Sequence, residues 1–80
     1  MDLNVGDVID ALDTYDKWYE STVVDKKFEN STYTWSAQIH FNGWSNKYRE
    51  WLPTHSQRLA KKGKWTSGPY ISSYKFIYIQ

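Results

Sequence analysis

The residue types most able to form a ligand site gather in one stretch, residues 39–53, around a tight Asn42-Gly43 turn. If Ser45–Lys47 forms a helical turn, Trp44 and Tyr48 stand at positions i and i+4 and face the same way. Phe41 ends the apolar face of one predicted strand, and Tyr19 begins that of another. Three or four rings converging on one opening form an aromatic cage.

A methylated ammonium group has definite reasons to enter such a cage. It keeps its charge but loses hydrogen-bond donors and hydration, so ring faces attract it at roughly 0.5–2 kcal/mol each. A carboxylate from Asp13 or Asp16 adds Coulomb attraction. The competing interpretation is that the rings are core, and we expect this for Trp51, packed on Ile39 and Val23.

Enzyme signatures are missing from the sequence. Its two histidines show no metal-ligand spacing, and phosphate-loop, dinucleotide and nucleophile-elbow motifs are absent. With no cysteine, thiolate zinc sites and disulfides are excluded. We therefore expect a non-catalytic protein without metal or cofactor. Four acids recur every third residue, and we expect them on the solvated surface: Asp7, Asp10, Asp13 and Asp16.

Charge is distributed unevenly along the chain. Residues 1–30 carry a net −5 and residues 31–80 a net +6, which give the total of +1. Either the two halves interleave and their charges pair, or an acidic face accompanies a basic end. A basic end with exposed rings suits RNA or single-stranded nucleic acid through phosphate contact and base stacking. The residues for that alternative are Arg58, Lys61, Lys62 and Lys64.

Short strands must position these side chains. Period-2 alternation and β-branched or aromatic residues predict strands at 7–12, 18–24, 35–41 and 48–52, with a polar loop at 28–32. Single helical turns are expected at residues 45–47 and 56–59. Short strands at this spacing, joined by turns, predict an all-β fold, a small bent SH3-like barrel of about five strands.

Eighty residues make one domain near the lower size limit for a stable core. We expect residues 1–62 to form the barrel and residues 63–80 to be a basic linker followed by a C-terminal strand at 70–79. That strand is apolar on both faces, so it must pair with an edge, and we favour the edge of the first strand. The absence of an apolar span or leader indicates an intracellular protein.

The motif order resembles one family of modules. Val5-Gly-Asp-Val8, Lys17-Trp-Tyr-Glu-Ser21, Ile39-His-Phe-Asn-Gly-Trp44 and Tyr48-Arg-Glu-Trp-Leu-Pro53 look like the chromo-barrel or Tudor-knot domains of MYST-type acetyltransferases and MRG-type chromatin proteins. The resemblance runs over residues 4–60. It implies a five-strand barrel that binds methyl-lysine or RNA, in the nucleus, as part of a larger protein or complex.

Carried over by position, the resemblance places the aromatic cage on Tyr19, Phe41, Trp44 and Tyr48, with Asp13 near the remaining wall. By the same resemblance, Trp51 matches the family's structural tryptophan and Glu50 its structural acidic residue. The sequence supports three functional hypotheses. The first is recognition of methylated lysine on a histone or other protein tail, the second is RNA binding, and the third is a protein scaffold that uses the C-terminal strand.

Overall fold

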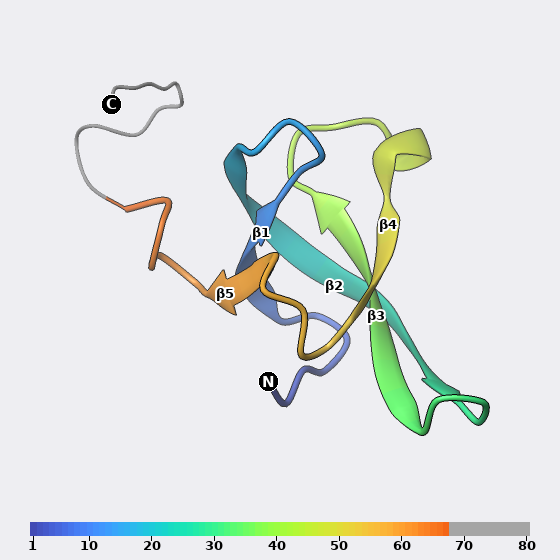
Figure 1. The fold of residues 1–80 in the computed structure, drawn as a ribbon. Helices are drawn as coiled ribbons and strands as arrows, with labels where there is room; N and C mark the ends of the chain where they lie inside the picture. Colours follow the sequence, from blue (N-terminus) through green and yellow to red (C-terminus); the bar gives the residue numbers. More distant parts are fainter. Residues whose placement is uncertain (68–80) are drawn as a thin grey trace.

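The computed structural model describes residues 1–67, and these fold into a single antiparallel sheet (Figure 1). Its strands follow the order β4-β3-β2-β1-β5, and the sheet is open because β4 and β5 stand at its two edges. The all-β prediction is confirmed. The elements are β1 (Val8–Leu12), β2 (Trp18–Glu29), β3 (Thr34–Phe41), the 3-10 helix η1 (Asn46–Tyr48), β4 (Glu50–Pro53) and β5 (Leu59–Lys61).

The core lies on one face of this sheet. Ala37, Ile39 and Phe41 of β3 alternate inward and are buried, as the sequence predicts, and Val23 of β2 lies opposite Ile39. The other members of the core cluster come from β1, β4, β5 and the N-terminal segment: Leu3, Ile9, Ala11, Leu52 and Leu59.

A β-bulge divides the long strand β2 into two halves. Val23 pairs with Ile39, but Asp25 pairs with Gln38, so Val24 is an extra residue on β2. After the bulge the inward residues change from odd to even positions. Phe28, opposite Trp35, therefore lies on the same face of the sheet as the core.

Several local expectations are wrong. Phe28 and Glu29 belong to β2 and not to a loop, and the turn occupies residues 30–33. Tyr48 ends the 3-10 helix, and β4 begins only at Glu50. Residues 56–59 form a hydrogen-bonded turn without a helix, and Leu59–Lys61, where no strand was predicted, form β5.

Trp51 is not the buried tryptophan of the core. It pairs with Gln38 on the outer face, is 38% exposed, and carries Lys27 Nζ 4.3 Å from its ring centroid. Leu52 takes the inward place opposite Ala37. The physical reason is the pleat, since adjacent residues of a strand point to opposite faces and only one of the two can enter the core.

Asp10 is also placed differently from our expectation, because it is fully buried. Its carboxylate accepts four hydrogen bonds from the segment after β5. The donors are Gly63 N (3.1 Å), Trp65 N (2.7 Å), Thr66 N (3.1 Å) and Thr66 Oγ1 (2.7 Å). Gly63 has φ +84°, a conformation that glycine adopts without strain, and this turns its N–H toward the carboxylate. Asp10 thus anchors residues 63–66 to β1.

Arg58, which stands just before β5, links β1 to the edge strand β4. Its Nε donates to Leu12 O at 3.0 Å, and its Nη2 lies 2.9 Å from Glu50 Oε1 at the start of β4. The contact with Glu50 is an ion pair rather than an aligned hydrogen bond. The side chain therefore bridges from the end of β1 to the start of β4, where no ladder connects those strands.

The expected C-terminal strand at 70–79 lies outside the described residues. The edge that we favoured for it is already used, since β5 pairs with β1 through Ile9–Lys61, Asp10–Ala60 and Ala11–Leu59. The division at residue 62 stays a proposal.

The anchoring role of Asp10 gives a stability prediction. In Asp10→Asn the amide nitrogen replaces one acceptor oxygen and faces buried donors, so we expect a loss of about 2–4 kcal/mol in the free energy of unfolding. Asp16→Asn is the matched control. Asp16 lies in an exposed turn at φ +63°, which Asn tolerates, and the change should stay within about 0.5 kcal/mol. Urea denaturation measures the stability of both variants, and equal unfolding midpoints would contradict the anchoring role of Asp10.

Candidate functional site

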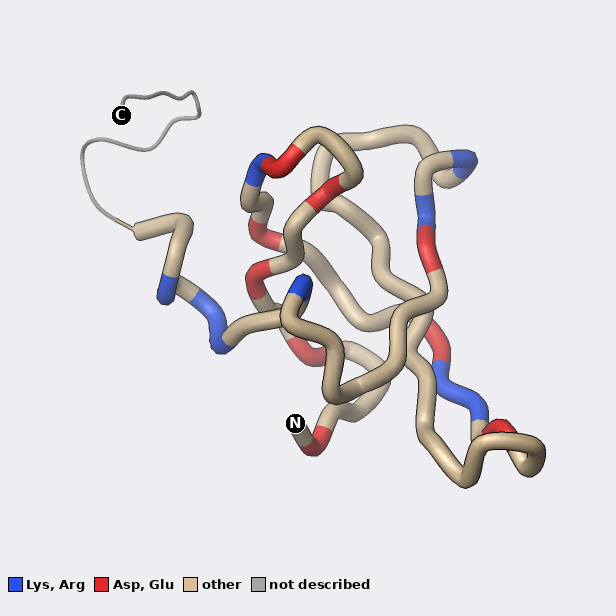
Figure 2. The backbone as a smooth tube through the Cα atoms, in the orientation of Figure 1, with Lys and Arg blue, Asp and Glu red and all other residues tan. Residues whose placement is uncertain are grey.

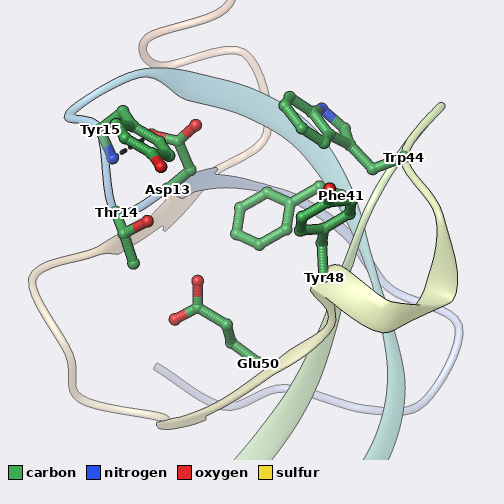
Figure 3. A pocket seen from close by; sticks show the side chains of 7 residues that line it. All are labelled: Asp13, Thr14, Tyr15, Phe41, Trp44, Tyr48 and Glu50. Atoms are coloured by element: carbon green, nitrogen blue, oxygen red, sulfur yellow. Dashed lines mark hydrogen bonds between the residues drawn. The ribbon is translucent and has the colours of Figure 1, made fainter.

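Four segments converge at one end of the sheet around a small hollow (Figure 3). Phe41 ends β3, Trp44 follows the turn after it, Tyr48 ends η1, and Asp13 begins the loop between β1 and β2. This loop and the end of β3 meet because β2 runs antiparallel to both β1 and β3. In Figure 3 the three rings lie on one side of the hollow, with Asp13 and Tyr15 facing them from the other.

Local hydrogen bonds fix the approach of Trp44 and Tyr48. Gly43 at φ +88° allows the tight turn in which Trp44 N donates to Phe41 O at 3.0 Å. Ser45 caps η1, and Tyr48 N donates to Ser45 O at 3.0 Å. One helical turn between the two rings therefore places them side by side, as their spacing predicts.

The rings meet nearly at right angles. Trp44 and Tyr48 have centroids 5.3 Å apart at 78°, and Tyr19 contacts Trp44 at 5.4 Å and 79°. Tyr19 also meets Phe41 at 6.2 Å and 83°. Phe41 is buried, whereas Trp44 and Tyr48 are partly exposed. We call Tyr19, Phe41, Trp44 and Tyr48 the aromatic mouth, a cluster of nearly perpendicular rings in which Trp44 and Tyr48 are the exposed members.

The loop opposite these rings is shaped by the Asp13 carboxylate. Its Oδ1 accepts hydrogen bonds from Tyr15 N at 2.8 Å and Lys17 N at 2.9 Å, and Asp13 N donates to Lys17 O at 2.9 Å. These bonds close the turn with Asp16 in the left-handed region. Asp13 is therefore held in place by its own loop, facing the hollow.

Two carboxylates give the hollow a negative character. Burial and, secondarily, the Asp13 carboxylate raise the pKa of the Tyr19 hydroxyl above its ordinary value of 10.0. Glu50 lines the hollow as well, but its charge is balanced by Arg58. Asp13 is thus the carboxylate able to act on a cation among the rings.

The size of the hollow limits what enters it. Its volume is about 60 Å³, several-fold below the roughly 300–1,000 Å³ of sites that enclose drug-sized ligands. A small head group or the end of a long side chain fits. Among residues 1–67 no group of three or more His, Cys, Asp or Glu is placed to hold a metal ion.

The residues that sequence reasoning placed in the cage lie near one another, and Phe41, Trp44, Tyr48 and Asp13 line the hollow. Tyr19 contacts Phe41 and Trp44 but does not line the hollow, and neither does Asp16, the other carboxylate considered. Sequence reasoning missed Thr14 and Tyr15. Their position in the turn just before Tyr19 was the available signal, because that turn must lie at the same end of the sheet.

The residues proposed for nucleic acid separate into two groups. Arg58 is engaged by Glu50 and Leu12, whereas the three lysines follow or end β5. Lys62 Nζ lies 3.8 Å from Glu20 in an exposed ion pair. Figure 2 shows acidic and basic positions close together at several places along the backbone. Trp18 and Trp65 stack at 5.9 Å and 29°, with Lys64 Nζ 5.2 Å from the Trp65 centroid.

Comparison with known proteins finds a partial similarity. The chain is 34% identical over 55 residues to PHD finger protein 20-like protein 1 of chicken, mouse and rat. The match covers 69% of this chain but only 7% of the chicken protein and 5% of the mouse and rat proteins. No protein-family model matches. This similarity and the small all-β fold are compatible with a Tudor- or chromo-type domain. The described residues contain no helix long and apolar enough to cross a bilayer.

The electrostatics of the mouth can be tested by titration. Removing the Asp13 charge in Asp13→Asn should lower the pKa of Tyr19, leaving only the larger effect of burial. NMR of the Tyr19 ring carbon bound to the hydroxyl, followed against pH, measures this. Folded Tyr19 holds its proton more tightly than the unfolded chain does. Its contribution to stability is therefore complete below about pH 10 and is lost as the pH rises through the folded pKa. An unchanged Tyr19 pKa in the variant would contradict the proximity of Asp13.

Proposed function

We propose that this chain is a non-catalytic binding module that recognises methylated lysine on a histone or other protein tail through the aromatic mouth. The observation that carries the proposal is the corner formed by Trp44 and Tyr48, two rings at 78° to each other that both line a small hollow with Asp13. Such a corner presents two negative ring faces to one cation at once.

The chemistry of the methylated ammonium matches each part of this hollow. Its methyl groups replace hydration, so contact with the rings costs little desolvation, while its positive charge is retained. The Asp13 carboxylate adds attraction across the hollow. An unmodified ammonium is smaller and strongly hydrated, so it loses more on leaving water. The site should therefore distinguish the modified side chain from the unmodified one.

The cellular setting belongs to the same proposal. The partial similarity to a PHD finger protein and the resemblance to chromo-barrel and Tudor-knot modules favour a nuclear module within a larger protein or complex. No reaction is assigned to the site. Its partner would be a protein tail that reaches the hollow with a single lysine side chain.

The test is a titration followed by backbone amide shifts, with Gly/Ser peptides carrying one lysine in the unmodified, mono-, di- and trimethylated forms. We expect methyl-dependent shifts at Asp13–Tyr19 and Phe41–Tyr48. Trp44→Ala should weaken binding of the best peptide about 2- to 30-fold, the range for one ring at roughly 0.5–2 kcal/mol.

Trp51→Ala is the matched control, because it removes an indole of similar exposure from the outer face, away from the hollow. Its affinity for the methylated peptide should equal that of the parent protein. Shifts that do not depend on methylation, or that avoid the mouth, would contradict the proposal.

A second candidate function is supported by one observation, the stacked pair Trp18 and Trp65, with Lys64 near the Trp65 ring and two further exposed lysines, Lys61 and Lys62, just before it in the chain. A stacking platform flanked by positive charge suits single-stranded nucleic acid. Lys62 is held only by a long ion pair to Glu20, so a phosphate can compete for it.

For this candidate, affinity for a short single-stranded RNA should fall steeply with salt. Replacing Lys61, Lys62 and Lys64 together by Gln should reduce the slope of log affinity against log salt by about two units, at roughly 0.7 per phosphate contact on a single strand. Lys26→Gln is the control at the other end of the sheet. No measurable RNA binding at low salt would eliminate this function.

A further inference from the structure

Three aromatic rings at the far end of the β2–β3 hairpin form a second exposed surface, the hairpin-tip rings Phe28, Tyr33 and Trp35. Phe28 meets Trp35 at 5.4 Å and 64°, and meets Tyr33 at 6.1 Å and 74°. In Figure 1 the hairpin extends beyond the rest of the sheet. Trp35 and Phe41 stand near opposite ends of β3, about 20 Å apart at strand spacing, so this surface is separate from the aromatic mouth.

The rings are exposed because the neighbouring strands end before them. β1 pairs with β2 only as far as Thr22, and β4 pairs with β3 only as far as Ser36. The core face of the hairpin therefore continues past the ends of the two neighbouring strands, β1 and β4. The exposed fractions are 40% for Phe28, 83% for Tyr33 and 48% for Trp35.

The area of this surface argues against self-association. Typical aromatic side-chain areas scaled by these exposed fractions give roughly 250–450 Å², against about 800 Å² per partner in a standard stable interface. Patches of this size on monomers are often functional. A short peptide is the occupant whose footprint matches.

Charge argues against nucleic acid and against strand addition. In the hairpin Asp25 and Glu29 balance Lys26 and Lys27. Lys27 pairs with Glu29 at 3.3 Å, and Lys26 Nζ lies 4.6 Å from the Trp35 centroid, so neither lysine begins a basic track for phosphates. Four charges within residues 25–29 also protect the free edge of β2 from pairing with another strand.

We propose that the hairpin-tip rings bind a neutral, proline-rich segment of a partner protein in the polyproline II conformation. Proline rings pack on aromatic faces, and the segment loses little conformational entropy because it is extended before binding. Its carbonyls have no internal partners, and Trp35 and Tyr33 supply an indole N–H and a hydroxyl as donors. The aromatic makeup and the balanced charge of the surface match a ligand without charge.

The probe is acetylated and amidated decaproline, titrated into the 15N-labelled chain. We expect shifts concentrated at Lys26–Trp35, including the Trp35 indole N–H, and a weakening of at least about fivefold in Trp35→Ala. Tyr33→Asn is a second variant that cannot fail through misfolding, since Tyr33 is exposed at φ +54° and Asn favours that region. Its melting temperature should stay level or rise, while decaproline binds about three- to tenfold more weakly.

Trp44→Ala is the matched control, and it should bind decaproline as the parent protein does while binding the methylated peptide more weakly. The two sites can thus fail independently. Absence of decaproline shifts at the hairpin would overturn the proposal. It would equally be overturned if oligothymidylate, but not decaproline, shifted these residues, or if their signals broadened with protein concentration alone.

Discussion

The buried carboxylate of Asp10 accepts hydrogen bonds from Gly63, Trp65 and Thr66, and these bonds hold the chain after β5 against β1. A charged acceptor with four donors is among the stronger local arrangements, and each donor would be left unsatisfied without it. The ladder between β5 and β1 has only three residue pairs, so among the described residues these hydrogen bonds are the main additional attachment of β5 to the sheet.

The stack of Trp65 on Trp18 follows from the same anchor. Since Trp18 begins β2 directly after the Asp13–Lys17 loop, the anchor also steadies one wall of the aromatic mouth.

How far the sequence predicts this structure depends on whether the information is local. The alternation of Ala37, Ile39 and Phe41 and the Asn42-Gly43 turn are local signals, and both correspond to the observed elements. The mouth follows from them, because antiparallel neighbours bring the end of β3 beside the start of β2. Asp10 could not be placed this way, since an acid in an alternating strand looks like a surface residue until its donors, more than fifty positions later, are known. Trp51 and Trp35 also depend on long-range partners. The face on which Trp51 lies is set by the pairing of β4 with β3, and Trp35 is exposed because β4 ends before it.

The sheet serves two surfaces of different chemistry. At the mouth, rings meet at right angles around a hollow with a carboxylate opposite, which favours a compact cation. At the hairpin tip, rings form a continuous exposed strip with balanced charge, which favours an extended neutral chain. Both use aromatic side chains, which supply large contact areas with few rotatable bonds. The high aromatic content of so small a domain therefore reflects its surface as much as its core, in which the buried apolar residues are mostly aliphatic.

The bulge at Val24 sets the relation between these surfaces. Before it, β2 presents its odd-numbered residues to the core, and after it the even-numbered ones. The extra residue shifts the inward positions of β2 by one, so that the outer half of the hairpin follows an even-numbered pattern and the inner half an odd-numbered one. Paired insertions or deletions of two residues beyond Val24 would lengthen or shorten the projecting arm without rotating a single core side chain. Deletion of Val24 would make the β2–β3 ladder regular without changing its pairs, because Asp25 would then follow Val23 directly and Phe28 would still lie opposite Trp35. The length of the arm can thus change in steps of two residues, while the face on which each of its side chains lies is set by its pairing with β3.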